Sequence, residues 1–360
     1  MMSKKPLVRD DLNILKGYHS PQLDVPVKLN TNESPFSLPD GFLEELSSAL
    51  EKLDLNRYPK RDANELCLSI AERESLNEKQ VFAANGSNEI IQSIFLAFGG
   101  HNRSVLIFEP TYAMHSQIAK ITGTRVVSGL REIDFQVNAD AALRLIEKEK
   151  PEIVFLCSPN NPTGNLESEA LIKSILAKLN DSGGLLVLDE AYKEFANQSF
   201  SLTVDEGSNL IFLRTFSKVW KLAGIRLGYL LAPEWCIDEI KNVSLPYHLD
   251  SIKQKAGVLA LKHENEMLAQ LENVKEEKNR VYENLLDFSV NVWPSEANFL
   301  LFKPNEIDGY KLWSDLFEKG VLVRDCSSWE GLEGCLRVTI GNPEENTRFL
   351  EALQEILNNG

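Results

Sequence analysis

The sequence lacks three features that would each point to a particular class of protein. No apolar run is long enough to cross a bilayer, so no membrane-spanning segment is expected. The five cysteines are scattered, odd in number and without a C-x-x-C pair, which argues against a disulfide framework and against a zinc or other metal site. The chain also lacks a positive excess. Its 38 basic and 53 acidic residues give a net charge of −15, which argues against nucleic acid or an anionic membrane as a partner.

What is present is the composition of a globular protein with a large core. Hydrophobic residues make up 43% and charged residues 25% of 360 residues, a length that suggests about two domains. No apolar segment follows the short basic start, so a signal peptide is not expected. Together with the scattered thiols, this makes the cytoplasm the expected compartment.

The pattern of apolar residues predicts an α/β fold in two parts. Strand-like runs alternate with helical segments such as 168–179, which favours a mostly parallel central sheet flanked by helices. The strand-like runs are 104–108, 125–128, 152–157, 185–188, 210–213 and 227–231. After residue 250 a long helix over about 251–286, strands at 298–302 and 336–340 and a last helix over 343–357 predict a smaller α+β domain. We therefore expect an N-terminal arm (1–39), a large domain (40–250) and a small C-terminal domain (251–360).

Two polar residues stand where strands of the predicted sheet end. Asp189 follows the apolar run 185–188, and Lys218 closes the segment TFSK after the run 210–213. Ligands of such sheets bind outside the carboxyl ends of the strands, so both side chains are candidates for a site. Taken alone, Asp189 fits a helix-capping carboxylate equally well, and Lys218 fits a solvated surface lysine.

Several neighbouring residues suit a phosphate monoester. Arg226 is a forked cation between glycines, Ser217 is a neutral donor, and Ser87 and Asn88 follow the glycine turn at 86, where a helix is predicted to begin. The N–H groups of a helix start bind phosphate, although this segment alone fits an ordinary helix cap.

Two further strand ends carry candidate side chains. Asn161 follows the strand 152–157 in a turn rich in Pro and Asn, and Tyr112 follows the strand 104–108. An ordinary turn explains the first, and simple packing explains the second. The order and spacing of all these segments together is what points to one site.

This ordered set resembles the fold-type I pyridoxal 5'-phosphate (PLP) enzymes and, within them, the aminotransferases of the histidinol-phosphate group. The resemblance covers essentially the whole chain. Its segments are YHSPQLDVPVKLNTNESP at 18–35, LNRYP at 55–59, GSNE at 86–89, DEAY at 189–192, TFSK at 215–218, LPYHL at 245–249 and LRVTIG at 336–341.

The resemblance implies a role for each cofactor residue. Lys218 would form the Schiff base and carry the proton, Asp189 would keep the pyridine nitrogen protonated, and Tyr192 and Asn161 would hydrogen-bond the phenolic oxygen. Tyr112 would stack on the ring. Ser217, Arg226 and the backbone at Ser87 and Asn88 would hold the phosphate. Tyr58 would reach the phosphate from the partner subunit of a homodimer.

The resemblance also implies a substrate site and a reaction. Arg337 would clamp an acidic group of the substrate. Arg324 and Tyr18 would meet the substrate's phosphate or the side-chain carboxylate of glutamate, and Asn32 and Asn161 would also bind the substrate. The implied reaction is ping-pong transfer of an amino group between L-glutamate/2-oxoglutarate and imidazole-acetol phosphate/L-histidinol phosphate, a step of histidine biosynthesis. Taken alone, Arg324 fits a surface ion pair with Asp325.

Three alternatives stay open at this stage. An aromatic amino-acid aminotransferase and a threonine-phosphate decarboxylase share most of these segments, and a PLP-binding module of a transcription regulator is the third. The acidic charge disfavours the last. Phe216, Trp220 and Lys221 differ from the small or aliphatic residues that the family has around the lysine, and we expect them to narrow the pocket.

Overall fold

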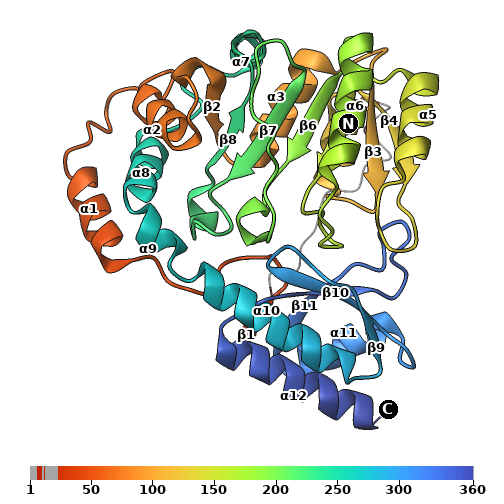
Figure 1. Cartoon of the computed structure of the whole chain (residues 1–360). Coiled ribbons are helices and arrows are strands. Elements are labelled where there is room, and N and C mark those ends of the chain that lie inside the picture. The colour runs from red at the N-terminus through yellow and green to blue at the C-terminus, as the bar shows by residue number, and fades with distance from the viewer. Residues whose placement is uncertain (1–5, 10–11, 13–22, 360) are drawn as a thin grey trace, which may run out of the picture.

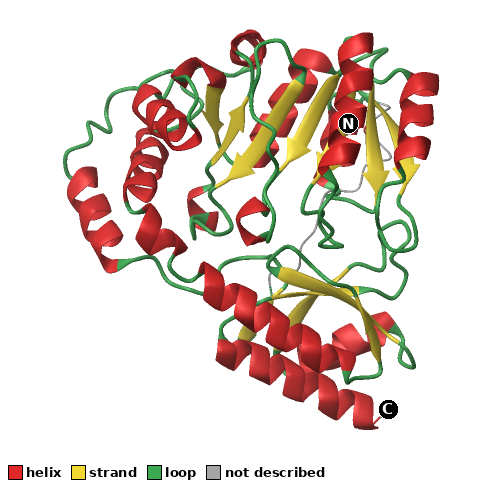
Figure 2. Cartoon of the chain, viewed as in Figure 1, coloured by secondary structure: helices red, strands yellow, loops and turns green. Residues whose placement is uncertain are grey.

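The computed structural model describes residues 6–9, 12 and 23–359, whose strands form two sheets with their own helices (Figures 1 and 2). The larger sheet has seven strands in the order β2-β8-β7-β6-β5-β3-β4. Their bounds are β2 Val81–Ala84, β3 Ser104–Glu109, β4 Arg125–Leu130, β5 Ile153–Cys157, β6 Leu185–Asp189, β7 Leu210–Thr215 and β8 Gly228–Leu231. Only β8 runs antiparallel to its neighbours, which confirms the predicted mostly parallel sheet.

Helices cover both faces of this sheet, because its strands are apolar on both faces. In β5, Ile153 and Phe155 pack on one side while Val154 and Leu156 pack on the other. The first side is covered by α3 Ser87–Phe98, α4 Met114–Ile121 and α7 Glu234–Val243. The second side is covered by α2 Asn64–Glu74, α5 Ala139–Glu149 and α6 Glu169–Ser182. The two helical layers fix the carboxyl ends of β3, β5, β6 and β7 along one edge.

The sequence reading found six of these strands and missed β2. Its four residues, VFAA, are too few to show a period. The helix predicted over 168–179 begins one residue later, because Ser168 is its N-cap and accepts a hydrogen bond from Leu171 N (3.2 Å).

The second sheet has five strands in the order β1-β11-β12-β10-β9. They are β1 Val27–Leu29, β9 Val290–Val292, β10 Phe299–Pro304, β11 Val321–Asp325 and β12 Leu336–Thr339, packed with α11 Gly309–Glu318 and α12 Pro343–Asn359. The strand β1 belongs to the predicted arm, yet it pairs in parallel with β11, and Val27 and Leu29 are buried. Part of the arm is thus an integral edge strand. The domain boundaries at 39/40 and 250/251 stay predictions.

The long helix predicted over 251–286 is wrong in one respect. The structure has three helices there: α8 Ser251–Lys262, α9 Glu264–Leu268 and α10 Leu271–Leu286. The first break falls at His263, whose imidazole lies 3.2 Å from Glu45 in α1 Asp40–Leu50. This contact with α1 occurs where the helical path turns, so tertiary packing overrides a continuous helical pattern.

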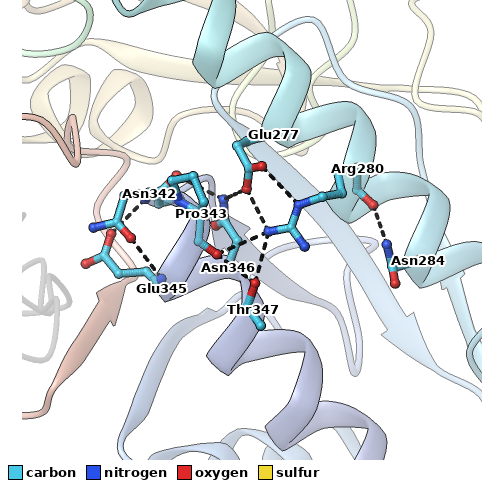
Figure 3. A network of polar contacts seen from close by, with 9 residues as sticks. Glu277, Arg280, Asn284, Asn342, Pro343, Glu345, Asn346 and Thr347 are labelled. Carbon is cyan, nitrogen blue, oxygen red and sulfur yellow. Dashed lines mark hydrogen bonds and ion pairs between the residues drawn. The ribbon is translucent and has the colours of Figure 1, made fainter.

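A polar network ties α10 and α12 to the end of β12 (Figure 3). The Asn346 side chain accepts a hydrogen bond from Gly341 N (2.8 Å) and donates to Glu277 (2.8 Å). Glu277 in turn accepts two hydrogen bonds from Arg280, at 2.9 and 2.7 Å. The network holds the residues after β12 in place, and β12 carries Arg337 toward the larger sheet.

Two findings bear on the expected class of the protein. Among residues 6–9, 12 and 23–359, no helix combines the length and the apolar character needed to cross a membrane. All five cysteines are buried free thiols.

Candidate active site

Every predicted site residue except Tyr18, Tyr58 and Arg324 lines one pocket. The pocket is lined by residues at and just after the carboxyl ends of the parallel strands. These strand ends face the second sheet (Figure 1). Lys218 and Asp189 come from one sheet and Arg337 comes from the other. Residues distant in the sequence therefore form one site.

Lys218 lies in the pocket, where its surroundings disfavour the charged form of its amine. Its Nζ donates a hydrogen bond to the Thr31 carbonyl oxygen (3.1 Å) and lies 5.5 Å from the centre of the Tyr192 ring. Burial lowers the pKa of this amine to about 7, and the positive charge of Arg337 adds to the effect. An amine with this pKa is substantially neutral near pH 7 and can act as a nucleophile or a base.

Asp189 ends β6 as a nearly fully buried carboxylate. One of its oxygens lies 2.9 Å from Nε2 of His115, which is fully buried in α4. The other oxygen accepts a hydrogen bond from Ala191 N (3.1 Å). The His115 ring packs on Phe155 with centroids 4.6 Å apart. A buried carboxylate fixed in this way can stabilise a cation in front of it.

The Tyr192 hydroxyl joins the two sheets. It accepts hydrogen bonds from the side-chain amides of Asn32 (2.9 Å) and Asn161 (3.3 Å). Asn32 is itself held by Thr339, whose Oγ1 accepts from the Asn32 N–H at 2.9 Å. Burial raises the pKa of Tyr192, so the phenol stays protonated and keeps a proton to donate into the pocket.

A phosphate-sized site lies at the start of α3. Its N-cap, Gly86, supplies no side-chain hydrogen bond, so the first N–H groups of the helix face the pocket without a side-chain cap. The guanidinium of Arg226 lies 3.4 Å from Ser217 Oγ, to which it donates. A Cβ on Gly228 would approach Ser87 N to 2.7 Å, so only glycine allows this approach. Tyr112 donates to Asn88 Oδ1 (3.2 Å) at the same edge.

Arg337 supplies a buried cation from the second sheet. Its Nη1 donates to Asn161 Oδ1 (2.5 Å) and its Nη2 to the Asn30 carbonyl oxygen (2.8 Å). Its Nε–H is buried and has no hydrogen-bond partner in the described part of the chain. Arg324 lies directly opposite Arg337 across β11 and β12, so both project from one face of the sheet. Arg324 is buried but does not line the pocket.

Among the described residues, Tyr58 and Arg324 are the predicted site residues that do not line the pocket. Tyr58 is 81% exposed and stacks on Tyr247 with ring centroids 4.6 Å apart. Within one chain it does not reach the site, and its predicted role in a partner's site stays a prediction. Tyr18 lies outside the described residues.

The expectation that Phe216 and Trp220 narrow the pocket is wrong. Both side chains are fully buried and pack on each other at 5.2 Å, and Phe216 packs on Tyr229 at 5.5 Å. Arg73 lies over the Trp220 ring at 5.0 Å. None of these residues lines the pocket, and neither does Lys221. The pocket side of this segment is instead formed by Thr215, Ser217 and Lys218.

Sequence reasoning missed several residues of the site, and two of their side chains bear on function. His115 is the second residue of α4, and a lone histidine there gives no local signal of function. Trp329 lines the pocket from the loop between β11 and β12, more than a hundred residues from the lysine. Gly331 and Gly334 in that loop both have a positive φ, and no local pattern marks the tryptophan between the strands.

Comparison with known proteins identifies the family. Residues 24–353 match the model of the class I and II aminotransferases. The histidinol-phosphate aminotransferase of Corynebacterium diphtheriae is 40% identical to this chain, over 97% of this chain and 96% of the relative.

Solved structures agree on the fold. The histidinol-phosphate aminotransferase of Clostridium acetobutylicum has a TM-score of 0.86 at 26% identity, covering 93% of this chain and 100% of its own. That of Sinorhizobium meliloti, solved with pyridoxal-5'-phosphate, has a TM-score of 0.88 at 20% identity over the full length of both chains.

The chain belongs to the class I and II aminotransferase family and is a PLP-dependent aminotransferase of fold type I. The donor set fits this cofactor. The pocket combines a neutralisable lysine, a buried carboxylate and an uncapped helix start beside an arginine. These groups match the aldehyde, the ring nitrogen and the phosphate of PLP in charge and chemistry.

Proposed function

We propose that this member of the aminotransferase family is a histidinol-phosphate aminotransferase. It transfers an amino group between L-glutamate/2-oxoglutarate and imidazole-acetol phosphate/L-histidinol phosphate, by a ping-pong mechanism, in histidine biosynthesis. The observation that carries the proposal is the buried Arg337, which reaches the lysine pocket from the second sheet and whose Nε–H has no partner among the described residues. Both amino substrates bring an anionic group to this cation.

Different pocket residues hold the phosphate and the ring nitrogen of the cofactor. The N–H groups at Ser87 and Asn88, the Ser217 hydroxyl and Arg226 bind its phosphate. Asp189, positioned by His115, holds the proton on the ring nitrogen. When bound, PLP supplies an electron-withdrawing ring that stabilises negative charge at the substrate Cα.

The phenolic edge and the ring face of the cofactor have their own partners. Tyr192 and Asn161 donate hydrogen bonds to the phenolic oxygen, and Asn32 orients the Tyr192 hydroxyl through their 2.9 Å contact. Tyr112 lies against the ring, oriented by its hydrogen bond to Asn88. These contacts fix the cofactor plane relative to Lys218.

Lys218 Nζ moves the proton of the reaction. The pKa of about 7 in the cofactor-free pocket makes this amine readily neutral. A neutral amine can take a proton from the substrate Cα and return it one position further along the cofactor. The Thr31 carbonyl oxygen, 3.1 Å away, holds the amine when it is not engaged.

The substrate anion is bound by the arginines of the second sheet. Arg337 receives the carboxylate or phosphate in its fork, and Arg324, its cross-strand neighbour, adds positive charge behind it. Two buried cations side by side repel each other. The negative charge of a substrate phosphate bound beside them offsets this repulsion. Tyr18 would meet the same group.

We further propose that the enzyme is a cytoplasmic homodimer with shared sites. Tyr58, Leu55 and Leu245 are large apolar side chains with exposures of 81%, 66% and 75%, and Tyr58 stacks on Tyr247. Exposed apolar residues gathered on two neighbouring loops suit a protein contact. Tyr58 would then reach the cofactor phosphate of the partner.

A half-reaction tests the proposed substrate. The PLP form is mixed with L-histidinol phosphate in the absence of any keto acid, and the cofactor absorbance is followed. Conversion to the amino form of the cofactor, reversed by 2-oxoglutarate, supports the proposal. No conversion with L-histidinol phosphate, together with conversion by phenylalanine or carbon dioxide release from threonine phosphate, would replace it by one of the alternatives.

Mixed dimers test the shared site. Lys218→Ala and Tyr58→Ala variants are each expected to be nearly inactive, and mixing them under exchange conditions should restore up to about a quarter of the activity. Light scattering gives the mass. A monomer in solution, or no recovery on mixing, would contradict the shared site.

A further inference from the structure

The loop between β11 and β12 brings one aromatic side chain into the active-site pocket. This loop, residues 326–335, leaves β11 directly after Arg324 and Asp325 and returns into β12 before Arg337. Trp329 is its half-buried centre and lines the pocket. The loop therefore connects the strand that carries Arg324 to the strand that carries Arg337, the two arginines proposed to bind the substrate anion.

Backbone hydrogen bonds close this loop on itself. Three successive turns are closed by hydrogen bonds from Trp329 N to Cys326 O (3.0 Å), Leu332 N to Trp329 O (3.1 Å) and Cys335 N to Leu332 O (2.9 Å). Cys326 N then bonds to Cys335 O (3.0 Å), which closes the loop at its base. A backbone closed in this way has less freedom left to lose when a ligand binds.

The aromatic residues of the pocket differ in the polar contacts that their side chains already make. The Tyr192 hydroxyl is fixed by two amides and its ring faces the lysine ammonium at 5.5 Å. The Tyr112 hydroxyl is bonded to Asn88 at the phosphate edge. The indole of Trp329 packs against the apolar cluster that contains Leu301 and Leu332. Among the pocket aromatics in the described chain, Trp329 is the one whose side chain makes no polar contact with another residue.

The arginines cannot separate the two amino substrates from each other. L-Glutamate and L-histidinol phosphate each present an anion to Arg337, so discrimination must come from the rest of the substrate. A carboxylate side chain is repelled by the negative face of an indole ring, whereas an imidazole or imidazolium ring stacks on it.

We infer that the indole of Trp329 is the surface on which the imidazole ring of the substrate lies, and that it selects this substrate over others. The inference rests on the proposed function and adds the specificity-determining residue to it. Trp329 touches the substrate at the end remote from the reacting carbon. Its contribution is to binding of the ring and not to proton transfer.

The test compares two ligands on three variants. Trp329→Leu removes the aromatic face, Trp329→Phe keeps a ring and loses the indole N–H, and Trp293→Leu is the matched control. Trp293 packs in the same apolar cluster but does not line the pocket. Retention of the cofactor spectrum and of the far-ultraviolet circular dichroism verifies folding of each variant.

Binding is measured apart from activity. The keto compounds carry no amino group to exchange with the PLP form, so calorimetry of the holoenzyme with imidazole-acetol phosphate or 2-oxoglutarate measures binding alone. Trp329→Leu is expected to weaken the binding of imidazole-acetol phosphate about tenfold, or ~1.4 kcal/mol. Its dissociation constant for 2-oxoglutarate should stay within about twofold of wild type. Trp329→Phe should retain most of the affinity for imidazole-acetol phosphate, and Trp293→Leu should retain the wild-type affinity for both ligands.

The half-reactions provide the second readout. For Trp329→Leu, kcat/KM with L-histidinol phosphate should fall about tenfold, while kcat/KM with L-glutamate stays within about twofold. Equal losses for both donors, or no loss for either, would overturn the inference. A loss in Trp329→Phe as large as in Trp329→Leu would also overturn it, because it would assign the effect to the indole N–H. If wild-type enzyme does not convert L-histidinol phosphate at all, the proposed function fails instead.

Discussion

The depressed pKa of Lys218 predicts a stability difference that depends on pH. Burial, reinforced by Arg337 and Arg226, lowers the pKa of the amine from 10.5 to about 7 in the cofactor-free protein. The unfolded chain holds this proton up to about pH 10, whereas the folded chain releases it near pH 7. Between these values the unfolded state binds more protons, so the free energy of unfolding rises with pH.

The magnitude follows from the two pKa values. Each pH unit is worth about 1.4 kcal/mol, so a change from 10.5 to about 7 costs on the order of 5 kcal/mol at and below pH 7. Above pH 7 this cost declines, and it vanishes near pH 10.5. Lys218→Met removes the titrating group. The cofactor-free variant should therefore be several kcal/mol more stable than wild type at pH 6.5, and the difference should shrink as pH rises.

Urea denaturation of the cofactor-free proteins from pH 6.5 to pH 9.5 measures this difference. Lys148→Met is the control, because Lys148 is 78% exposed and its removal should leave the pH profile unchanged. A Lys218→Met difference that stays constant over this range would refute the reasoning. So would a variant that is less stable than wild type at pH 6.5.

Two further predictions concern packing and charge. Gly228→Ala places a methyl 2.7 Å from a backbone nitrogen of the phosphate-binding turn and should weaken PLP binding at least about tenfold in reconstitution, whereas Gly224→Ala, with no atom within 4 Å of its Cβ, should not. Arg131→Met leaves Glu167 buried without its cation, both side chains being 1% exposed, and should cost about 3–5 kcal/mol in urea unfolding. Arg125→Met, which removes an exposed ion pair, should cost less than about 1 kcal/mol. Equal effects within either pair would contradict the argument.

The cofactor side of the site could be predicted because its information is local. Asp189 and Lys218 each follow an apolar strand directly, and the carboxyl ends of parallel strands meet along one edge. Arg226 and Ser217 lie within the same segment of chain. Local order thus sufficed to assemble the residues that line one half of the pocket, and the family resemblance gave them roles.

The other half depends on contacts that no local pattern contains. Arg337 reaches Asn161 across 176 positions of sequence, and His115 reaches Asp189 across 74. The resemblance supplied Arg337, but nothing in the sequence pointed to His115 or Trp329. The strand β1 was also missed, because three residues cannot show a period and its partner β11 lies almost 300 residues away.

The strands that carry Asp189 and Lys218 are also tied together behind the pocket. The residue after Asp189 is Glu190, and Arg214 of β7 donates to it at 2.8 Å while also pairing with Glu74 of α2. Tyr229 of β8 donates to Glu74 as well (3.1 Å).

Alternation along a strand explains why these charges lie where they do. Thr215 faces the pocket, so Arg214 faces the opposite side, and the same holds for Asp189 and Glu190. Buried ion pairs add little net stability, because desolvation offsets their attraction. Their effect here is geometric: they fix the ends of β6 and β7 against α2. Charges that do not line the pocket thus help to position the strand ends that Asp189 and Lys218 follow.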